Sequence, residues 1–389
     1  MKVLLTFVIS ISAIFSSWAQ ESLFEMPQRQ RDSVFLRIER QYGEDSIFQL
    51  YDVFRLFKSV KKAQKRYASY HANTRKDILQ YLDLSNCQLN ELPSFLWECK
   101  KLKRLDIRGN IILKLPKSLR QLQHLTHIDW SDNELREARI KVPRGLSVVH
   151  LDLKSNGLHT FPKGLKHLKK VSFLSVDDNE IAQLSKNLRK LKSLESLTIS
   201  KNPKLNIDRF ALKGYGNLKS LVAINMQWES INPALFQLKS LQKLILSENR
   251  ITTIPCEIVK LKELTDLSFY KNELIEIPEC LFELQGLVQL DLFHNHLTAI
   301  PTSISRLQQL DQLYVAFNEI SYLPSSIGEI SSLKGLYIHH NKLTSLPDSF
   351  SKLHQVSTIR FNDNIFSAFP RAVLSMLDLS YIDSSNNDI

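Results

Sequence analysis

The sequence predicts an α/β solenoid, in which short coils stack into an arc with a parallel β-sheet on the concave face and helical turns on the convex face. A 23-residue period, an asparagine at one fixed place in it and a proline six residues later predict this fold. One step of the period has 24 residues, from Leu194 to Leu218. The repeats open at Leu79, Leu102, Leu125, Val148, Val171, Leu194, Leu218, Leu241, Leu264, Leu287, Leu310, Leu333 and Val356, with a partial copy from Leu379.

Each repeat follows the pattern L-x-x-L-x-L-x-x-N-x-L-x-x-L-P-x-x-L-x-x-L-x-x. The opening "LxxLxL" contains an alternating apolar run, which is typical of a strand. The proline, as in Pro301, suits the first residue of a helical turn, where a missing N–H is tolerated. Two further apolar residues, such as Ile304 and Leu307, are then expected to return to the core.

The asparagine follows the predicted strand, where the chain must turn. An inward column of amides is expected to satisfy backbone groups that this turn leaves unpaired. The column consists of Asn110, Asn133, Asn156, Asn179, Asn202, Asn249, Asn272, Asn295, Asn318, Asn341, Asn364 and Asn387.

This pattern resembles the leucine-rich repeat family in its 23-residue "typical" form, of the exported bacterial type. The resemblance covers Leu79 to Ile389 and implies a curved arc whose members mostly bind other proteins on the concave face. Departures are local: Cys87 and Met226 replace the asparagine, and Ser185 replaces the proline. We therefore divide the chain into residues 1–19, 20–78 and 79–389, the last with thirteen full repeats and one partial repeat.

Residues 1–19 are predicted to be a secretory signal peptide. Lys2 gives a positive start, Val3 to Phe15 are apolar, and "SWA" offers a cleavage site before Gln20. This apolar stretch is too short for a membrane span, and no later one reaches 18 residues. The protein is expected to be exported, to the periplasm, the cell surface or the medium, with no transmembrane segment.

Residues 20–78 do not repeat and are predicted to form a helical N-terminal cap, because the first coil of a solenoid exposes core leucines. Ile47, Leu50, Phe54 and Phe57 share one helical stripe. The basic residues after it admit a second interpretation, a helix for anionic lipid or polyphosphate. They are Lys58, Lys61, Lys62, Lys65 and Arg66.

The far edge of the sheet is predicted to be uncovered. Leu379, Ile382 and Ile389 lie in the partial repeat, where an open edge invites pairing. Self-association through this edge is therefore one hypothesis.

Four aspartates, Asp83, Asp106, Asp129 and Asp152, occupy one outward strand position in the first four repeats. Like charges stacked in this way repel one another unless partnered. We expect neighbouring cations, among them Arg108, to make the ladder self-neutralising; a site for a cation or basic ligand is the alternative. His127 and His150 beside Asp129 and Asp152 include zinc-ligand types, but a flat sheet rarely converges ligands tetrahedrally, so no metal is predicted.

In four later repeats, aromatic residues and histidines occupy the outward strand and strand-end positions. Exposed aromatic patches usually mark contact surfaces, although packing between strands would also explain them. We favour a partner-binding site. It comprises Tyr270, Phe293, His294, His296, Tyr314, Phe317, Tyr337, His339 and His340.

The cysteines divide into two pairs. Cys87 takes an asparagine position and Cys99 a core leucine position, so both are expected to be buried thiols. Cys256 and Cys280 lie at nearly equivalent convex positions, one residue out of step, and their disulfide is left open.

The sequence points to a non-enzymatic scaffold that binds a protein on its concave face. It contains no phosphate-binding glycine loop, HExxH or G-x-S-x-G motif, and no cofactor is predicted. The alternatives are a binder of envelope polysaccharide and a structural role through the open edge. The formal net charge of +11 is assigned to a solvated basic surface, and no nucleic-acid partner is predicted.

Overall fold

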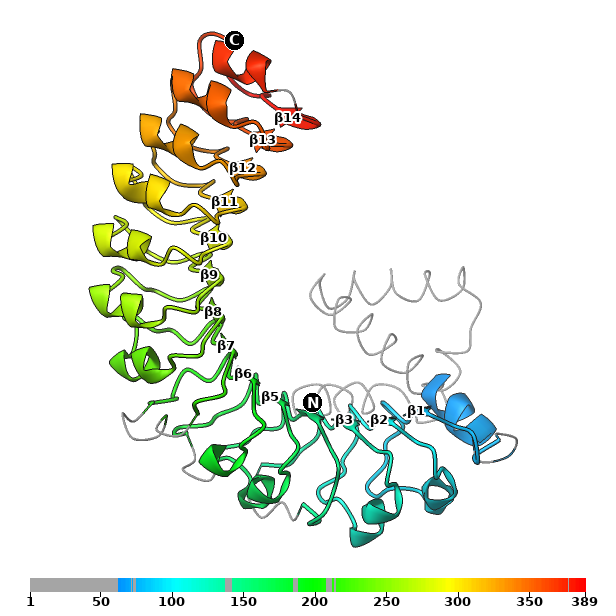
Figure 1. Cartoon of the computed structure of the whole chain (residues 1–389). Helices are drawn as coiled ribbons and strands as arrows, with labels where there is room; N and C mark the ends of the chain where they lie inside the picture. Colours follow the sequence, from blue (N-terminus) through cyan, green and yellow to red (C-terminus); the bar gives the residue numbers. More distant parts are fainter. Residues whose placement is uncertain are drawn as a thin grey trace, which may run out of the picture.

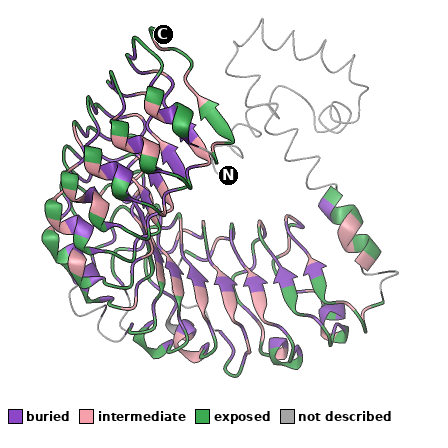
Figure 2. Cartoon of the chain, turned by 45° about the horizontal axis from the view of Figure 1, so that its top comes forward, coloured by how far each residue is buried: buried purple, intermediate pink, exposed green. Residues whose placement is uncertain are grey.

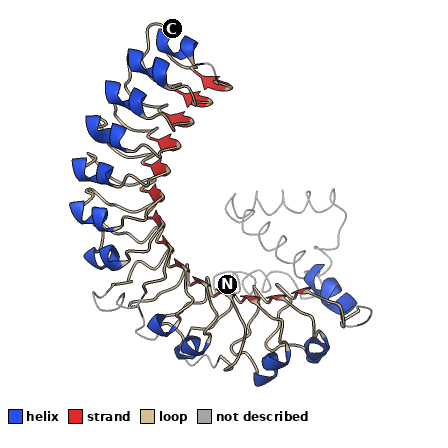
Figure 3. Ribbon diagram, in the orientation of Figure 1, coloured by secondary structure: helices blue, strands red, loops and turns tan. Residues whose placement is uncertain are grey.

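The computed structural model describes residues 62–389 except 71, 73–74, 137–141, 185–187, 208–211, 213–214 and 377. Within this part of the chain, fourteen parallel strands form one sheet in sequence order. The strands line the inside of an arc, and short helical segments lie along its outside (Figures 1 and 3). The predicted α/β solenoid is confirmed. The predicted signal peptide and the apolar stripe of the cap lie outside the described residues.

Every strand has three residues, and its central residue is apolar. Each strand pairs with the next in the register that the period requires, so that Asp83, Asp106, Asp129 and Asp152 are true neighbours. The strands are β1 (Tyr81–Asp83), β2 (Arg104–Asp106), β3 (His127–Asp129), β4 (His150–Asp152), β5 (Phe173–Ser175), β6 (Ser196–Thr198), β7 (Ser220–Val222), β8 (Lys243–Ile245), β9 (Asp266–Ser268), β10 (Gln289–Asp291), β11 (Gln312–Tyr314), β12 (Gly335–Tyr337), β13 (Thr358–Arg360) and β14 (Tyr381–Asp383).

The helical segments of the convex side are single 3₁₀ turns. Most begin one residue later than the sequence predicts: Pro301, for example, is extended (φ −60°, ψ 149°) and precedes the first helical residue. The exception is Pro233, which lies inside its turn behind the N-cap Asn232. The segments are η1 (Ser94–Glu98), η2 (Lys117–Gln121), η3 (Lys163–His167), η4 (Leu188–Lys190), η5 (Pro233–Gln237), η6 (Cys256–Lys260), η7 (Glu279–Glu283), η8 (Thr302–Arg306), η9 (Ser325–Glu329), η10 (Asp348–Lys352) and η11 (Arg371–Ser375).

The asparagine column behaves as predicted. The side-chain amide of Asn295 donates to the carbonyls of Phe269 and Leu292, both at 3.0 Å, and its oxygen accepts the N–H of Leu274 at 3.0 Å. One side chain thereby joins consecutive coils and satisfies buried backbone groups that would otherwise be unpaired. Cys87 and Met226 lack that amide, but each donates its own N–H to the asparagine of the next repeat.

The core is one continuous column inside the coils, from Leu82 to Met376 (purple in Figure 2). Ile304 and Leu307 are fully buried, as the spacing predicts. Cys87 and Cys99 are buried free thiols, also as predicted. Each coil therefore contributes to a core that it cannot close alone.

A helix over residues 62–70 covers the first coil. Arg66 forms an ion pair with Asp83 at 2.7 Å and donates to the carbonyl of Ser85 at 2.6 Å. The ring of Tyr67 lies edge-on to Phe95 with centroids 5.7 Å apart. These contacts favour the capping interpretation for this part of the segment, because the Arg66 charge is directed at the sheet.

Two further features concern the convex side and the last strand. Cys256 and Cys280 form a disulfide between η6 and η7, with Cα atoms 5.5 Å apart. In β14, Ile382 is 40% exposed, whereas the equivalent Ile359 in β13 is fully buried. Among the described residues, no helix is long and apolar enough to cross a membrane.

Candidate partner-binding surface

Six of the nine predicted site residues form one contiguous cluster of rings along β9 to β12. Phe317 is at its centre, with its ring 3.8 Å from that of His340, 4.9 Å from Phe293 and 5.5 Å from His294. Tyr270 and His339 complete the set through Phe293, at 5.5 and 5.6 Å. We call these six residues the ring cluster: Tyr270, Phe293, His294, Phe317, His339 and His340.

Tyr314 and Tyr337 form a separate tyrosine pair on the same face. They are register partners on β11 and β12, and their rings stack at 4.5 Å with an angle of 10° between planes. His296 does not join either group, because its ring is directed at Glu319, with Nδ1 3.8 Å from that carboxylate.

The backbone explains how His294, Phe317 and His340 come to be stacked. Each precedes the asparagine of its repeat, and the residue at this place has a left-handed φ between 51° and 67° in all fourteen repeats. Some earlier repeats fill the place with residues that tolerate this conformation, such as Asn86, Gly109 and Asp132, and others hold Ser155, Lys201, Glu248 or Lys271. A phenylalanine there is a backbone outlier, which directs attention to function.

The rings are more buried than a fully exposed patch would be. Phe293, Phe317, Tyr314 and Tyr337 are half-buried, and only His294 and His296 are exposed. The expectation of an outward, open His339 is wrong: its side chain is 5% exposed, because the neighbouring rings and the next coil cover it. Burial, with the charge of Arg360, lowers the pKa of His339 to about 4. Packing between strands and an accessible rim therefore coexist in the cluster.

The aspartate ladder has a local structural role that the sequence did not indicate. With the opening leucine as position 1, the asparagine is position 9 and the ladder aspartates are position 5. Each ladder carboxylate accepts the backbone N–H of position 7 in its own repeat, as Asp83 does from Ser85 at 2.9 Å. Asp106, Asp129 and Asp152 do the same at 3.0, 3.0 and 2.9 Å.

This N–H needs a side-chain partner because of the asparagine column. If the parallel ladder continued, the N–H of position 7 would donate to the carbonyl of position 6 in the preceding repeat, which for Arg108 is the carbonyl of Leu84. The side-chain amide of Asn110 already donates to that carbonyl. Aspartate two residues earlier supplies the missing acceptor, and Ser268 does so for Tyr270 at 3.2 Å.

Fewer cationic side chains pair with the ladder aspartates than the sequence predicted. Arg66 pairs with Asp83, and Arg108 lies 3.6 Å from Asp106 and 3.9 Å from Asp129. Burial raises the pKa of both Asp106 and Asp152. Hydrogen bonds from the backbone, more than a row of cations, stabilise this ladder.

His127 and His150, considered above together with Asp129 and Asp152 as ligand types, belong to a row of stacked rings. The two imidazoles lie 5.4 Å apart, and His150 stacks on Phe173 at 4.0 Å. Nowhere in the described part of the chain do three or more His, Cys, Asp or Glu side chains converge as metal ligands would.

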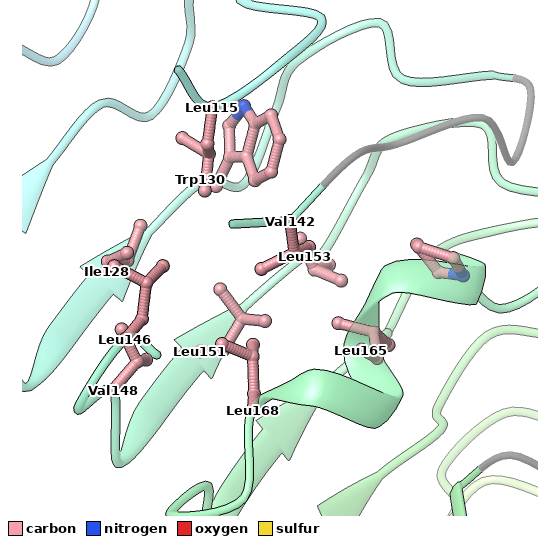
Figure 4. Close-up of a pocket in the computed structure, with 11 residues that line it drawn as sticks. Leu115, Ile128, Trp130, Val142, Leu146, Val148, Leu151, Leu153, Leu165 and Leu168 are labelled. Atoms are coloured by element: carbon pink, nitrogen blue, oxygen red, sulfur yellow. The ribbon is translucent and has the colours of Figure 1, made fainter. Parts of the chain in front are cut away.

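Two hollows lie away from the ring cluster. The first is an apolar cavity of about 10 Å³ inside the coils behind β3 and β4, beside Trp130 and Leu151 (Figure 4). A space of this size holds at most one water molecule. The second, about 380 Å³, lies at the turns after β3, β4 and β5, where Arg136 pairs with Glu134 and His159 with Glu180. Its charged groups are exposed and paired, so neither hollow offers a catalytic arrangement.

The repeat geometry agrees with comparisons to known proteins. Models of the leucine-rich repeat family match residues 239–297 and, separately, residues 79–99 and 332–353. The chain is a leucine-rich repeat protein. The matched segments share the strand, the asparagine turn and the buried leucines described above. No curated protein matches the sequence significantly.

Solved structures of other leucine-rich repeat proteins share the arc. A leucine-rich repeat protein of Leptospira interrogans is 26% identical, with a TM-score of 0.55, and the match covers 83% of this chain and 93% of that one. An internalin of Listeria monocytogenes is 19% identical, with a TM-score of 0.59, over 83% and 94% of the two chains. Toll of Drosophila, solved in complex with Spatzle, is 19% identical, with a TM-score of 0.62, over 77% and 46%.

Sequence reasoning missed Ala316, Arg360 and Asn362, and it did not connect them with Tyr314, Tyr337 and His339 of the predicted site. Positions 5 and 7 of the repeats that contain β11, β12 and β13 hold no aspartate or serine. The sequence shows that the frequent Asp or Ser at position 5 is missing in these repeats. The consequence of its absence became clear only from the structure, where position 5 accepts the N–H of position 7. The residues are Tyr314, Ala316, Tyr337, His339, Arg360 and Asn362.

Proposed function

We propose that this leucine-rich repeat protein is an exported, non-enzymatic scaffold that binds a protein partner on its concave face. The contact surface would be the rim of the ring cluster together with the tyrosine pair. The observation that carries the proposal is Phe317, held in a left-handed backbone conformation and stacked between His294 and His340. An asparagine or glycine would satisfy the fold at that place with less strain.

The shape of the molecule also supports binding. A preformed arc loses little conformational freedom on association, so more of the contact energy appears as affinity. Half-exposed aromatic side chains are enriched in the contact centres of protein interfaces. Toll, a neighbour in fold, is itself bound to a protein in its solved structure.

Export has independent support from the disulfide. Cys256 and Cys280 are bonded between adjacent coils, and structural disulfides persist in oxidising compartments. Together with the signal-like residues 1–19, this favours a periplasmic, surface or secreted location.

The test is an affinity capture from an envelope extract of the source organism, using residues 20–389 as bait. A first variant carries Tyr314→Ser, Phe317→Asn and Tyr337→Ser. A matched control carries Ile275→Ser, Tyr322→Ser and Leu374→Ser, which removes three exposed apolar side chains outside the sheet. Circular dichroism verifies that all three baits are folded.

The expected result is a protein retained by the native bait and by the control and absent from the first variant. Protease treatment of the extract should abolish the signal. A signal that survives protease and disappears after periodate oxidation would instead indicate a polysaccharide. Identical retention by all three baits would exclude the ring cluster as the contact surface.

A further inference from the structure

Three consecutive repeats leave a row of backbone donors without partners beside the ring cluster. In the described residues, the N–H groups of Ala316, His339 and Asn362, all at position 7, make no hydrogen bond. In their repeats position 5 is Tyr314, Tyr337 or Arg360, which offers no acceptor comparable to the ladder carboxylates. The flanking repeats are satisfied, since Phe293 donates to Asp291 and Ser385 to Asp383.

These N–H groups face the concave side. In the ladder repeats the same N–H is met by the outward side chain of position 5, and that geometry repeats with the period. Backbone donors in folded proteins are normally paired, so a row of N–H groups without protein partners can bind a ligand that reaches the concave face. Among the described residues, the N–H groups of Asp177 and Ser247, also at position 7, make no hydrogen bond either, but each is isolated, whereas β11–β13 leave three in succession.

Side-chain atoms with the same deficit collect at the same place. The Nδ1 of His339, the Nε of Arg360 and the Oδ1 of Asn362 are buried and without a hydrogen-bond partner. The side chains of His339 and Asn362 are 5% and 6% exposed. The guanidinium of Arg360 is engaged at one end only, by Asp383 at 3.4 Å. Among the described residues, four of the nine buried side-chain atoms without a hydrogen bond lie on His339, His340, Arg360 and Asn362, although His340 Nδ1 lies 3.4 Å from the Asp363 carboxylate.

The chemistry of these atoms indicates what is missing. Backbone N–H groups and a guanidinium are donors that bind a carboxylate, because charge-assisted hydrogen bonds are the strongest available to them. Asn362 Oδ1 is an acceptor, which suits a peptide N–H and not a free anion. A net charge of +11 favours the approach of an acidic partner.

We propose that the concave surface at β11–β13 binds an acidic side chain of a protein partner, whose carboxylate supplies the acceptor that Asp83 or Asp291 provides in other repeats. The inference rests on the proposed function and names the partner's chemistry at that surface. The carboxylate would accept from the N–H groups of His339 and Asn362 and from the Arg360 guanidinium, whose side chain is 37% exposed. The rings of Tyr337 and Phe317 would contact the apolar part of the same segment.

The test is an amide-resolved NMR titration of ¹⁵N-labelled protein with two short peptides. The probes are acetyl-Gly-Glu-Gly-Glu-Gly-amide and its glutamine counterpart, which differ only in charge. The expected result is a saturable downfield shift of the Ala316, His339 and Asn362 amides with the glutamate peptide, and binding about tenfold weaker for the glutamine peptide. Equal binding of the two peptides, or no response at these amides, would overturn the proposal.

Two variants at one position separate the carboxylate from the ring. Tyr337→Asp supplies an internal carboxylate to the N–H of His339 and should abolish the response to the glutamate peptide. Tyr337→Leu removes the ring without adding an acceptor and should retain it. Equal loss in both variants would assign the effect to the ring and contradict the proposal. Amide signals from β1 to β4 serve as the folding control in both.

The outcomes also separate this inference from the proposed function. If the capture identifies a partner that depends on the ring cluster while the peptides give no response, the scaffold function stands and the carboxylate site fails. If the peptides respond while the capture yields nothing, the site stands and the ring cluster is not the main contact.

Discussion

The rings of Phe317 and His340 lie 3.8 Å apart and within 13° of parallel, although they belong to different repeats and both have a left-handed backbone. The period brings them together, because residues 23 apart occupy the same place on successive coils. The left-handed conformation then sets the direction of both side chains. A stacked pair of this kind is worth about 1 kcal/mol beyond the area that it buries.

Replacing Phe317 tests whether the fold or a partner requires the ring. Phe317→Asn relieves a strain of about 1 kcal/mol but removes the four ring contacts of Phe317, whereas Phe317→Leu removes the contacts and keeps the strain. We expect the asparagine variant to be at least as stable as the leucine variant in urea unfolding. At an ordinary half-buried apolar position the order would be reversed, and that order would refute the strain argument.

His339 should make stability depend on pH. Burial and the Arg360 charge lower its pKa from 6.5 to about 4, so the unfolded chain binds more protons between those values. Its contribution is fully present above pH 6.5 and declines as the pH falls toward 4. The whole difference corresponds to about 3 kcal/mol.

The measurement is urea unfolding at pH 7.5 and 4.5 for the native chain and for His339→Phe. The variant should lose about 2–3 kcal/mol less than the native chain on acidification. His354→Phe is the control, because that histidine is exposed on the convex side. If His339→Phe and the native chain respond equally to acid, His339 is not the group that titrates.

The fold could be predicted from the sequence because each coil is specified by local spacing. Alternation in "LDLFHN" identifies β10, and the asparagine and buried leucines follow at fixed distances. The 3₁₀ turns begin one residue late because proline keeps the residue itself extended while the next one enters the turn. The disulfide could not be predicted because Cys256 and Cys280 are one residue out of step with the period, which would place them on opposite faces if they lay on strands. Between 3₁₀ turns, the Cα atoms still lie 5.5 Å apart.

The candidate site could be predicted only in part. Alternation correctly placed Tyr314 and Tyr337 on the concave side, where they stack. It could not reveal that His339 is buried, because burial there depends on the rings of Phe293 and Phe317 from two other repeats. The unpartnered N–H row was beyond sequence reasoning for a different reason. A missing acceptor has consequences only where the asparagine column has already displaced the normal partner.

The asparagine column should account for a large share of local stability. Asn318 donates to the carbonyls of Leu292 and Val315, both at 3.0 Å, and accepts the N–H of Leu297 at 3.0 Å. Asn318→Ala leaves these buried groups unpaired and should lower the free energy of unfolding by about 3 kcal/mol. Asn217→Ala is the control, since that exposed amide donates to one carbonyl only. A similar loss in both variants would contradict a special role for the column.

The disulfide predicts a thiol count and a stability difference. The bond closes a segment 24 residues long, which corresponds to about 3 kcal/mol in the chain-entropy treatment. The double variant Cys256→Ser, Cys280→Ser should therefore unfold at lower urea concentration. Its native circular dichroism should be unchanged, because Ile258, Leu281 and Phe282 still fill the core.

Thiol labelling checks the same assignment without a mutation. Burial raises the pKa of Cys87 and Cys99, so neither should react in the folded protein. In urea without reductant two thiols should be labelled, and after reduction four. Four reactive thiols in unreduced protein isolated from its native compartment would show that the bond does not form there. That result would also remove the argument for export that rests on it.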